Sequence, residues 1–327
     1  MQKFTISRLE KADIHKLGLL INSFDFNDYK RYGVFKKEVV CEYILREILK
    51  LSSDDKQNWI IVTQDKDKII GLISLAKISW AREVFGIEMA EIKHIITSAE
   101  YGNKKDIIKD PLSFIFQICD KERISHLSCR ISTDDYSAIH SLEEEGFRIM
   151  ETLVTYLFNK RKHKVLQLKD MSKIRSFKNG DLESLIEMVR GAFPLSRFYL
   201  DPKIPNEYVD KFYIKWVKEC CKGSLADKVL VAERKGEIIG FLSYRINKEL
   251  EKLTGYKIGC QGLSTVSKRG VGVYPALVKK SIQDFVQLYD FAEFDTQINN
   301  YEVIKIWQRF GFDFVRSKYS FHKWLGK

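Results

Sequence analysis

Two stretches of the chain repeat the same order of residue types, and this internal repeat limits the folds open to it more than any other feature. DYSAIHSLEEEGF occupies residues 135–147, and NYEVIKIWQRFGF occupies residues 300–312. In each stretch a capping residue, Asp135 or Asn300, precedes an amphipathic run, and Gly-Phe closes the stretch. The pattern predicts a helix that ends at a left-handed glycine, with the Phe entering the core at the head of the last strand.

A second pair of matching segments lies upstream of these helices. WIIVTQDKDKIIGLISL (59–75) and VLVAERKGEIIGFLSYRI (229–246) each predict a β-hairpin with Ile-Ile-Gly at the start of its second strand. Each half also opens with a strand followed by a helix. The order strand, helices, hairpin, strand, helix, strand, helix, strand therefore occurs twice. We expect two related α/β domains in tandem, each a mixed central sheet flanked by helices.

The length of the chain agrees with this division. Its 327 residues are enough for two domains of ~150 residues. We expect the first domain at 1–160, a basic linker at 161–173 and the second domain at 174–327. The densest basic run, KRKHK at 160–164, lies between the two halves, and a linker explains it better than a nucleic-acid-binding stripe does.

Composition narrows the class of protein. With 45% apolar and 30% charged residues, the chain is neither disordered nor fibrous. No apolar run approaches the ~20 residues of a membrane-spanning helix, and the opening MQKFTISRLEKAD lacks an apolar signal core. We expect a cytoplasmic protein that binds neither membranes nor nucleic acid. The net charge of +11 favours an anionic partner, for which a polyphosphate cofactor is one candidate.

The cysteines and histidines show no metal-ligand spacing. No CxxC or CxH pattern occurs, so free and mostly buried thiols are expected, with no disulfide and no metal site. The six cysteines are Cys41, Cys119, Cys129, Cys220, Cys221 and Cys260.

A phosphate-binding loop is predicted in the second half only. The strand GCQGLSTV (259–266) runs into SKRGVGVYPALV (267–278), which carries Gly270 and Gly272 beside a basic pair. Such glycines let the backbone approach a phosphate, and the following helix offers its free amides. The equivalent stretch of the first half, residues 87–118, has a single glycine and a helix-breaking Asp110-Pro111. We expect the first domain to have lost this site.

These residues resemble the GCN5-related N-acetyltransferase (GNAT) superfamily, whose acyl-CoA loop reads Arg/Gln-x-x-Gly-x-Gly/Ala. Arg269 and Gly272 match this pattern, whereas Tyr274 replaces its last small residue. NYEVIKIWQRFGF is similar to a later motif of the superfamily, in which Trp307 stands at the position of a Tyr. The resemblance implies acyl-CoA as co-substrate. The residues that it implies for acyl-CoA binding are Leu263, Ser264, Thr265, Lys268, Arg269, Gly270, Val271, Gly272, Val273, Tyr274, Asn300 and Trp307.

A narrower likeness covers most of residues 174–327. The segment AFPLSRFYLDPKIPNEYVDKFYIKWVKECCKG (192–223) is similar to the substrate-side helices of dTDP-fucosamine acetyltransferases. Its aromatic residues could equally pack a helix pair, but Arg197 and Asp201 are expected at the rim of a site because unpaired charges are costly to bury. The residues implied for substrate binding are Arg197, Phe198, Asp201, Tyr213, Trp216 and Gln297.

Acyl transfer to an amine needs a group that accepts a proton, donors for the acyl oxygen, and a route for the thiolate to leave. Backbone amides of 263–265 are expected to serve the acyl oxygen. Asp295, on one face of the strand FAEFDTQ with Glu293 and Gln297, is the candidate base. The Tyr that Trp307 replaces often protonates the thiolate in the superfamily. A thiol pKa of about 8.5 makes departure tolerable without an acid, and Tyr274 or Tyr301 could substitute.

The resemblance therefore implies an N-acyltransferase that acts on a dTDP-linked amino sugar, in the synthesis of precursors for a surface polysaccharide or lipopolysaccharide. Two alternatives stay open at this point. One is acylation of a protein, peptide or antibiotic amine. The other is an acyl-CoA sensor without catalytic activity, which the change from Tyr to Trp307 would suit.

Overall fold

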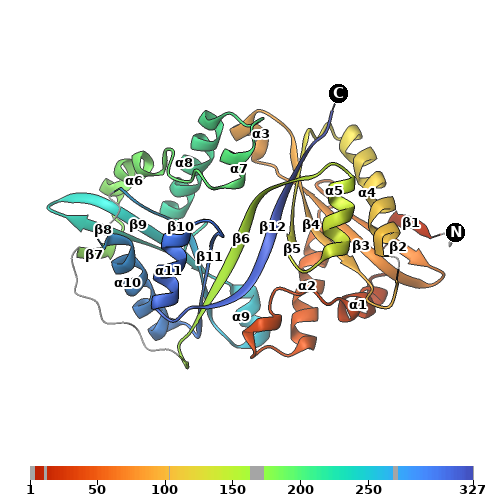
Figure 1. Ribbon diagram of the computed structural model, residues 1–327, viewed down its shortest axis with the longest axis horizontal. Helices are drawn as coiled ribbons and strands as arrows, with labels where there is room; N and C mark the ends of the chain where they lie inside the picture. The colour runs from red at the N-terminus through yellow and green to blue at the C-terminus, as the bar shows by residue number, and fades with distance from the viewer. Residues whose placement is uncertain (1–3, 11–12, 103, 163–172, 268–271, 327) are drawn as a thin grey trace. The chain divides into compact units, whose positions relative to one another are not determined.

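The computed structural model describes residues 4–10, 13–102, 104–162, 173–267 and 272–326, and its chain divides into two compact units. Unit 1 comprises Met1–Thr152 and Ser317–Lys327, and unit 2 comprises Leu153–Arg316. Each unit is an α/β structure that contains both parallel and antiparallel strand pairs (Figure 1). The fold class expected from the repeat is confirmed.

In unit 1 the strands lie in the order β1-β2-β3-β4-β5-β12. The strands are β1 (Thr5–Arg8), β2 (Asn58–Asp65), β3 (Lys68–Lys77), β4 (Met89–Thr97), β5 (His126–Ser132) and the end of β12 (Asp313–Trp324). The helices are α1 (Ile14–Ser23), η2 (Lys30–Tyr32), α2 (Lys37–Ser52), α3 (Ala81–Phe85), α4 (Lys104–Lys121) and α5 (Tyr136–Glu144).

In unit 2 the order is β6-β11-β10-β9-β8-β7. The strands are β6 (Arg148–Asn159, from residue 153), β7 (Lys173–Ser176), β8 (Lys228–Arg234), β9 (Glu237–Ile246), β10 (Ile258–Val266) and β11 (Phe291–Gln297). The helices are η3 (Asn179–Asp181), α6 (Leu182–Val189), α7 (Arg197–Leu200), α8 (Asn206–Lys222), α9 (Lys248–Thr254), α10 (Val273–Leu288) and α11 (Tyr301–Arg309).

Each unit takes one of its strands from the other half of the sequence. In unit 2, residues 153–159 of β6 pair antiparallel with all seven residues of β11. In unit 1, residues 318–324 of β12 pair antiparallel with β5. The repeat did not predict this exchange. The domain boundaries 1–160, 161–173 and 174–327 stay a prediction.

The core of unit 1 lies on both faces of its strands because alternate residues point to opposite sides. Ile61 of β2 packs with α4 and α5, whereas its neighbours Ile60 and Val62 pack with α1 and α2. Unit 2 has a comparable core in which α10 and α11 cover strands β6, β8, β9 and β11. Of the helices in the described part of the chain, none has both the length and the apolar composition needed to cross a bilayer.

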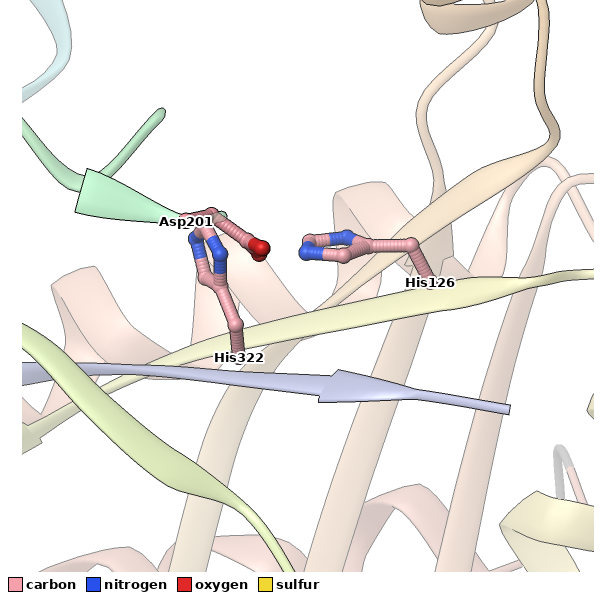
Figure 2. A group of neighbouring side chains, drawn as sticks. All are labelled: His126, Asp201 and His322. Atoms are coloured by element: carbon pink, nitrogen blue, oxygen red, sulfur yellow. The ribbon is translucent and has the colours of Figure 1, made fainter. Parts of the chain in front are cut away.

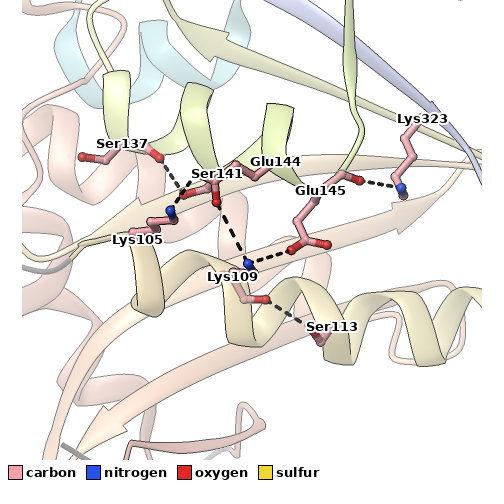
Figure 3. A network of polar contacts seen from close by, with 8 residues as sticks. All are labelled: Lys105, Lys109, Ser113, Ser137, Ser141, Glu144, Glu145 and Lys323. Atoms are coloured by element: carbon pink, nitrogen blue, oxygen red, sulfur yellow. Dashed lines mark hydrogen bonds and ion pairs between the residues drawn. The ribbon is translucent and has the colours of Figure 1, made fainter. Parts of the chain in front are cut away.

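Helices α4 and α5 of unit 1 are joined by surface ion pairs (Figure 3). Lys105 lies 2.6 Å from Glu144, and Lys109 lies 3.8 Å from Glu145. The expectation that Pro111 breaks a helix is wrong, because α4 continues through this buried proline. The carbonyl of Ile107, which Pro111 cannot bond, instead accepts a 3.4 Å hydrogen bond from the Thr63 hydroxyl.

The helix ends of the two repeats are only partly alike. Gly146 and Gly311 both adopt the predicted left-handed conformation, with φ of 79° and 83°. Asp135 caps α5 as predicted, accepting a 3.1 Å hydrogen bond from the Ala138 amide. The predicted capping role of Asn300 is wrong: its side-chain amide donates to the Thr296 hydroxyl at 3.0 Å and caps nothing.

Two buried histidines of unit 1 lie ring against ring (Figure 2). His126 on β5 and His322 on β12 are 4.4 Å apart between ring centroids, edge to face, and Trp324 packs 5.1 Å from His126. The six cysteines are free, as the sequence predicts. Burial raises the pKa of Cys119 to about 12, so this thiol is unreactive at neutral pH.

Candidate functional site

The candidate site of unit 2 begins where two parallel strands separate. Strands β10 and β11 pair only over Ile258–Cys260 and Phe291–Glu293. Beyond Cys260, β10 stays paired with β9, and β11 stays paired with β6. The edges of 261–266 and 294–297 that follow therefore diverge, and backbone amides along them become available to a ligand.

A β-bulge in β10 produces this divergence. The register with β9 shifts by one residue between Gln261 and Ser264, which bends the strand. The buried Ser243 of β9 fixes the bulge by donating a 3.0 Å hydrogen bond to the Leu263 carbonyl. A Cβ at Gly262 would lie 2.7 Å from the Ser243 hydroxyl, so this position favours glycine.

Four side chains meet beside the bulge. The indole N–H of Trp307 on α11 donates a 3.0 Å hydrogen bond to the hydroxyl oxygen of Tyr274 on α10. The side chains of Ser264 and Gln261 also hydrogen-bond Tyr274, and Gln261 donates to the Ser264 hydroxyl at 2.6 Å. Burial raises the pKa of Tyr274 to about 12, although these hydrogen bonds act in the opposite direction. Tyr274 is therefore protonated at neutral pH.

Trp307 itself is a core residue. Its side chain is 0% exposed and packs against the rings of Tyr156, Phe294 and Phe312. Of the two tyrosines that could substitute for an acid at position 307, the structure brings Tyr274 to the indole. Tyr301 is exposed on the first turn of α11.

The helix that follows the predicted phosphate loop starts at Gly272. This glycine is left-handed, with φ of 73°, and precedes the 16 residues of α10. Lys268, Arg269, Gly270 and Val271 lie outside the described residues. Val273 is buried and packs against Gly240. A Cβ added at Gly240 would lie 3.0 Å from the Cγ1 atom of Val273.

Gly240 belongs to the repeated Ile-Ile-Gly, and its counterpart in unit 1 behaves alike. A Cβ at Gly71 would lie 2.3 Å from Ile107 on α4. In both units the glycine therefore lets the next long helix pack closely on the hairpin.

The acidic strand face of β11 is divided between two roles. Glu293 forms a 2.7 Å ion pair with Arg316, so its charge is neutralised within the protein. Asp295 is exposed and accepts a 2.5 Å hydrogen bond from Thr155 of β6. Gln297 ends the strand, and its carbonyl accepts a 2.9 Å hydrogen bond from the Asn300 amide. Asp295 therefore has a more accessible carboxylate than Glu293.

The segment expected to bind substrate is an aromatic cluster. Tyr213 on α8 is buried and stacks on Phe193 at 4.3 Å and, in parallel, on Trp216 at 6.1 Å. Phe198 is also buried, and the half-buried guanidinium of Arg197 lies 4.8 Å from its ring. Tyr213 and Phe198 are thus largely core residues, while Arg197 and Trp216 keep accessible surface.

The expectation that Asp201 lies at an exposed rim is wrong. The residue is 1% exposed, and its carboxylate accepts a 3.0 Å hydrogen bond from the Lys203 amide. Sequence reasoning also missed Gln261 and Ser264 as partners of Tyr274. The only signal near them is the pair of glycines in GCQGLSTV, which is a weak indication of a bulge.

Comparisons with known proteins identify the fold. No protein-family model matches the chain. A GCN5-related N-acetyltransferase from Sphaerobacter thermophilus has a TM-score of 0.64 at 14% identity, covering 98% of this chain and 95% of its own. A tandem GNAT protein from the clavulanic acid biosynthesis pathway has a TM-score of 0.59 at 11% identity, covering 99% of both chains. The chain therefore has the fold of a tandem GNAT protein.

One further protein is similar in sequence to this chain over most of the length of both. The spore coat polysaccharide biosynthesis protein SpsD of Bacillus subtilis (strain 168) is 20% identical over 302 residues. The match covers 89% of this chain and 98% of that protein.

Proposed function

We propose that this protein is an acyl-CoA-dependent N-acyltransferase whose active site is the divergence of β10 and β11 in unit 2. The observation that carries the proposal is the protonated Tyr274, held by Trp307 and Ser264 beside a bulged strand with an open edge. A thioester and an amine can meet at such an edge, because the backbone supplies donors where negative charge develops.

The described residues fit acyl-CoA as co-substrate. The open edge of Leu263–Thr265 offers peptide groups that pair with an amide-containing chain as a neighbouring strand would. The amino end of α10, which follows Gly272, suits a phosphate because its first amides are free and its dipole is positive there. Lys268 and Arg269 are proposed to add charge at that end.

In the proposed reaction the amine nitrogen bonds to the acyl carbon as the carbon–sulfur bond breaks. The amine loses one proton, and the sulfur leaves as a thiolate that then takes up a proton from water. Asp295 is proposed to accept the amine proton, directly or through water, because its carboxylate is exposed and has a neutral partner in Thr155. Backbone amides of Leu263–Thr265 are proposed to stabilise the acyl oxygen.

Tyr274 is proposed to interact with the leaving sulfur, because Trp307 stands where the resemblance implies an acidic Tyr and cannot itself supply a proton. An indole N–H can only donate, so the Tyr274 oxygen accepts from Trp307 and its own proton stays directed elsewhere. With a Tyr274 pKa of about 12 and a thiol pKa of about 8.5, complete proton transfer would be unfavourable. The proposed role is therefore a hydrogen bond that stabilises the thiolate as it forms.

The proposed acceptor is the amino group of a nucleotide-linked amino-deoxy sugar, such as a dTDP-sugar, for a surface polysaccharide. Arg197 beside Phe198 can contact an anionic phosphate, and Trp216 offers an accessible ring for a base. The similarity to a protein of spore coat polysaccharide biosynthesis supports this substrate class.

An assay with acetyl-CoA tests the proposal. Release of free thiol would be measured with a panel of dTDP- and UDP-linked amino sugars, with lysine peptides and aminoglycosides as competing acceptors. Acceptor-dependent thiol release with an amino sugar is expected. Turnover with peptides or aminoglycosides alone would replace the substrate class, and acetyl-CoA binding without turnover on any amine would contradict an enzymatic role.

A further inference from the structure

Unit 1 contains a pocket of about 530 Å³, which is the size of a small-molecule site. It lies where β4 and β5 separate. These strands pair only over Met89–Ile92 and His126–Cys129, and a bulge at Lys93 shifts the register of β4 on β3. The freed segments 93–96 and 130–132 both line the pocket.

Aromatic rings line the side of the pocket that comes from the α1–α2 region. Phe24, Phe26 and Tyr29 lie between the two helices, and Tyr43 lies on α2. Phe24 packs on Phe26 at 5.7 Å, and Tyr29 packs on Tyr43 at 5.6 Å, both edge to face. All four rings are half-buried, so each keeps some surface that a planar ligand could contact.

Cations line the side that comes from the strands. Lys93 of β4, Arg130 of β5 and Lys318 of β12 belong to the lining on this side, and Lys50 of α2 is a fourth lining cation. Lys93 pairs with Glu91, and Lys318 lies 2.6 Å from Asp28. Lys50 is exposed and has no ion-pair partner among the described residues.

The guanidinium of Arg130 is held in place by two polar side chains, Glu151 and Ser320. Its Nη2 atom lies 3.4 Å from the carboxylate of Glu151, whose side chain is 2% exposed, and its Nε atom donates to Ser320 at 3.2 Å. The side chain of Arg130 is 40% exposed. Its Nη1 group contacts no acceptor among the described residues. A guanidinium fixed from one edge can bind an anion at the other without further loss of side-chain freedom.

The acidic residues of the lining have structural partners. Asp28 pairs with Lys318, and Asp135 accepts the Ala138 amide at the start of α5. Glu47 lies 3.9 Å from His94. Each of these carboxylates thus has a partner other than Arg130 and Lys50, and Glu151, which pairs with Arg130, does not belong to the lining.

We propose that this pocket binds an organic anion that carries a planar ring, of the size of a nucleoside monophosphate. The ring would lie against the aromatic residues, and the phosphate would meet Arg130, while Lys50 would add positive charge to the pocket. The proposal uses only residues of unit 1, and it is independent of the catalytic function proposed for unit 2.

Calorimetric titration of the full chain with uridine 5′-monophosphate tests it, with uridine and inorganic phosphate as separate probes. Saturable binding of the nucleotide, tighter than that of either part, is expected. Arg130→Gln should weaken it about tenfold or more, since a fixed guanidinium is lost. Lys50→Gln should weaken it about twofold to fivefold, because this cation is exposed.

Two controls make the result specific. Arg148→Gln removes an exposed arginine of unit 1 outside the lining, and Arg197→Ala alters the proposed acceptor site of unit 2. Arg148→Gln should leave nucleotide binding unchanged. The binding that remains in Arg197→Ala is the part that belongs to the pocket of unit 1, and the pocket variants should weaken that part in this background as well. Should Arg130→Gln fail to fold because Glu151 loses its partner, Lys50→Gln decides. No saturable binding, binding indifferent to the pocket variants, or phosphate binding as tightly as the nucleotide would each overturn the proposal.

Discussion

Trp307 donates its indole N–H to the hydroxyl oxygen of Tyr274 across 3.0 Å, so a core side chain orients a tyrosine beside the open strand edge. If Tyr274 stabilises the departing thiolate, Tyr274→Phe should lower kcat about 10-fold to 100-fold with little change in acyl-CoA affinity. Trp307→Phe should cost less, because the tyrosine hydroxyl is retained. Steady-state kinetics with both variants measures this.

The leaving group supplies a control for this prediction. An acyl donor whose thiol has a lower pKa needs less stabilisation, so the defect of Tyr274→Phe should shrink with such a donor. Equal defects with both donors would assign Tyr274 a structural role only. A melting curve for Trp307→Phe is needed beside the kinetics, because removing buried aromatic volume destabilises the core.

Gly272 is expected to matter for the co-substrate. Gly272→Asp places a negative side chain at the amino end of α10, where the positive dipole and free amides are proposed to meet phosphate. Acyl-CoA affinity measured by calorimetry should fall at least about tenfold, or ~1.4 kcal/mol. Gly255→Asp is the matched control, since Gly255 is also left-handed, at φ of 72°, and ends α9 with open space around it. An equal loss of acyl-CoA affinity in both variants would contradict a phosphate site at the amino end of α10.

Arg197 is expected to act on the acceptor. Arg197→Ala should raise the acceptor KM about tenfold or more, because a hydrogen bond to a charged group is worth roughly 1.5–3 kcal/mol, and acyl-CoA affinity should not change. Arg190→Ala is the control, because Arg190 is an exposed arginine of the same region whose one ion-pair partner among the described residues is Glu187. Asp201 is a poorer probe, since its buried carboxylate holds the Lys203 amide and its loss would disturb the loop. Wild-type kinetics in Arg197→Ala would leave the amino-sugar proposal without its main residue.

Packing between β10 and α10 should be sensitive to a single methyl group. A Cβ at Gly259 would lie 2.1 Å from the ring of Phe285, so Gly259→Ala should destabilise the protein by about 1–3 kcal/mol. Gly18→Ala in α1 is the contrast, because nothing lies within 4 Å of its new methyl group and alanine favours helix. Thermal melts of both variants compare them, and an unchanged Tm for Gly259→Ala would refute the packing at this contact.

The ion pairs that Arg175 makes with two carboxylates in unit 2 predict that the stability of the protein depends on pH. Arg175 lies 2.7 Å from both Asp181 and Glu233, and this pairing lowers the pKa of each carboxyl. A lowered folded pKa contributes stability above the unfolded pKa and loses it as pH falls through the folded value. The Tm deficit of Arg175→Gln should therefore be present at pH 7 and shrink below about pH 3.8, the ordinary pKa of Asp181. A deficit that persists at lower pH would mean that the arginine acts by packing.

Most of the fold could be predicted because the hydrophobic periods that define strands and helices are local properties of the sequence. The repeated Ile-Ile-Gly was visible, but its reason is tertiary: Gly71 and Gly240 each lie under the next long helix. The continuation of α4 through Pro111 was not predictable, because it depends on Thr63 from a distant strand.

The site was less predictable than the fold. A bulge shifts register by one residue, and GCQGLSTV contains no pattern that requires it. Trp307 and Tyr274 lie on different helices and are 33 residues apart in the sequence. Neither residue by itself therefore predicts the hydrogen bond between them. The exchange of β6 and β12 had no signal either. Both are 12-residue strands that follow the Gly-Phe of the repeat, so the repeat gives them the same place in each half.

This exchange predicts that neither half of the sequence folds without the other. A chain cut within 161–173 would give a second half without the strand that covers β11, and a first half without the strand that covers β5. Each fragment would expose a row of unpaired peptide groups, which favours aggregation. Deleting either half would therefore be expected to unfold the other, so both halves would be retained even if only one of them carried the catalytic site.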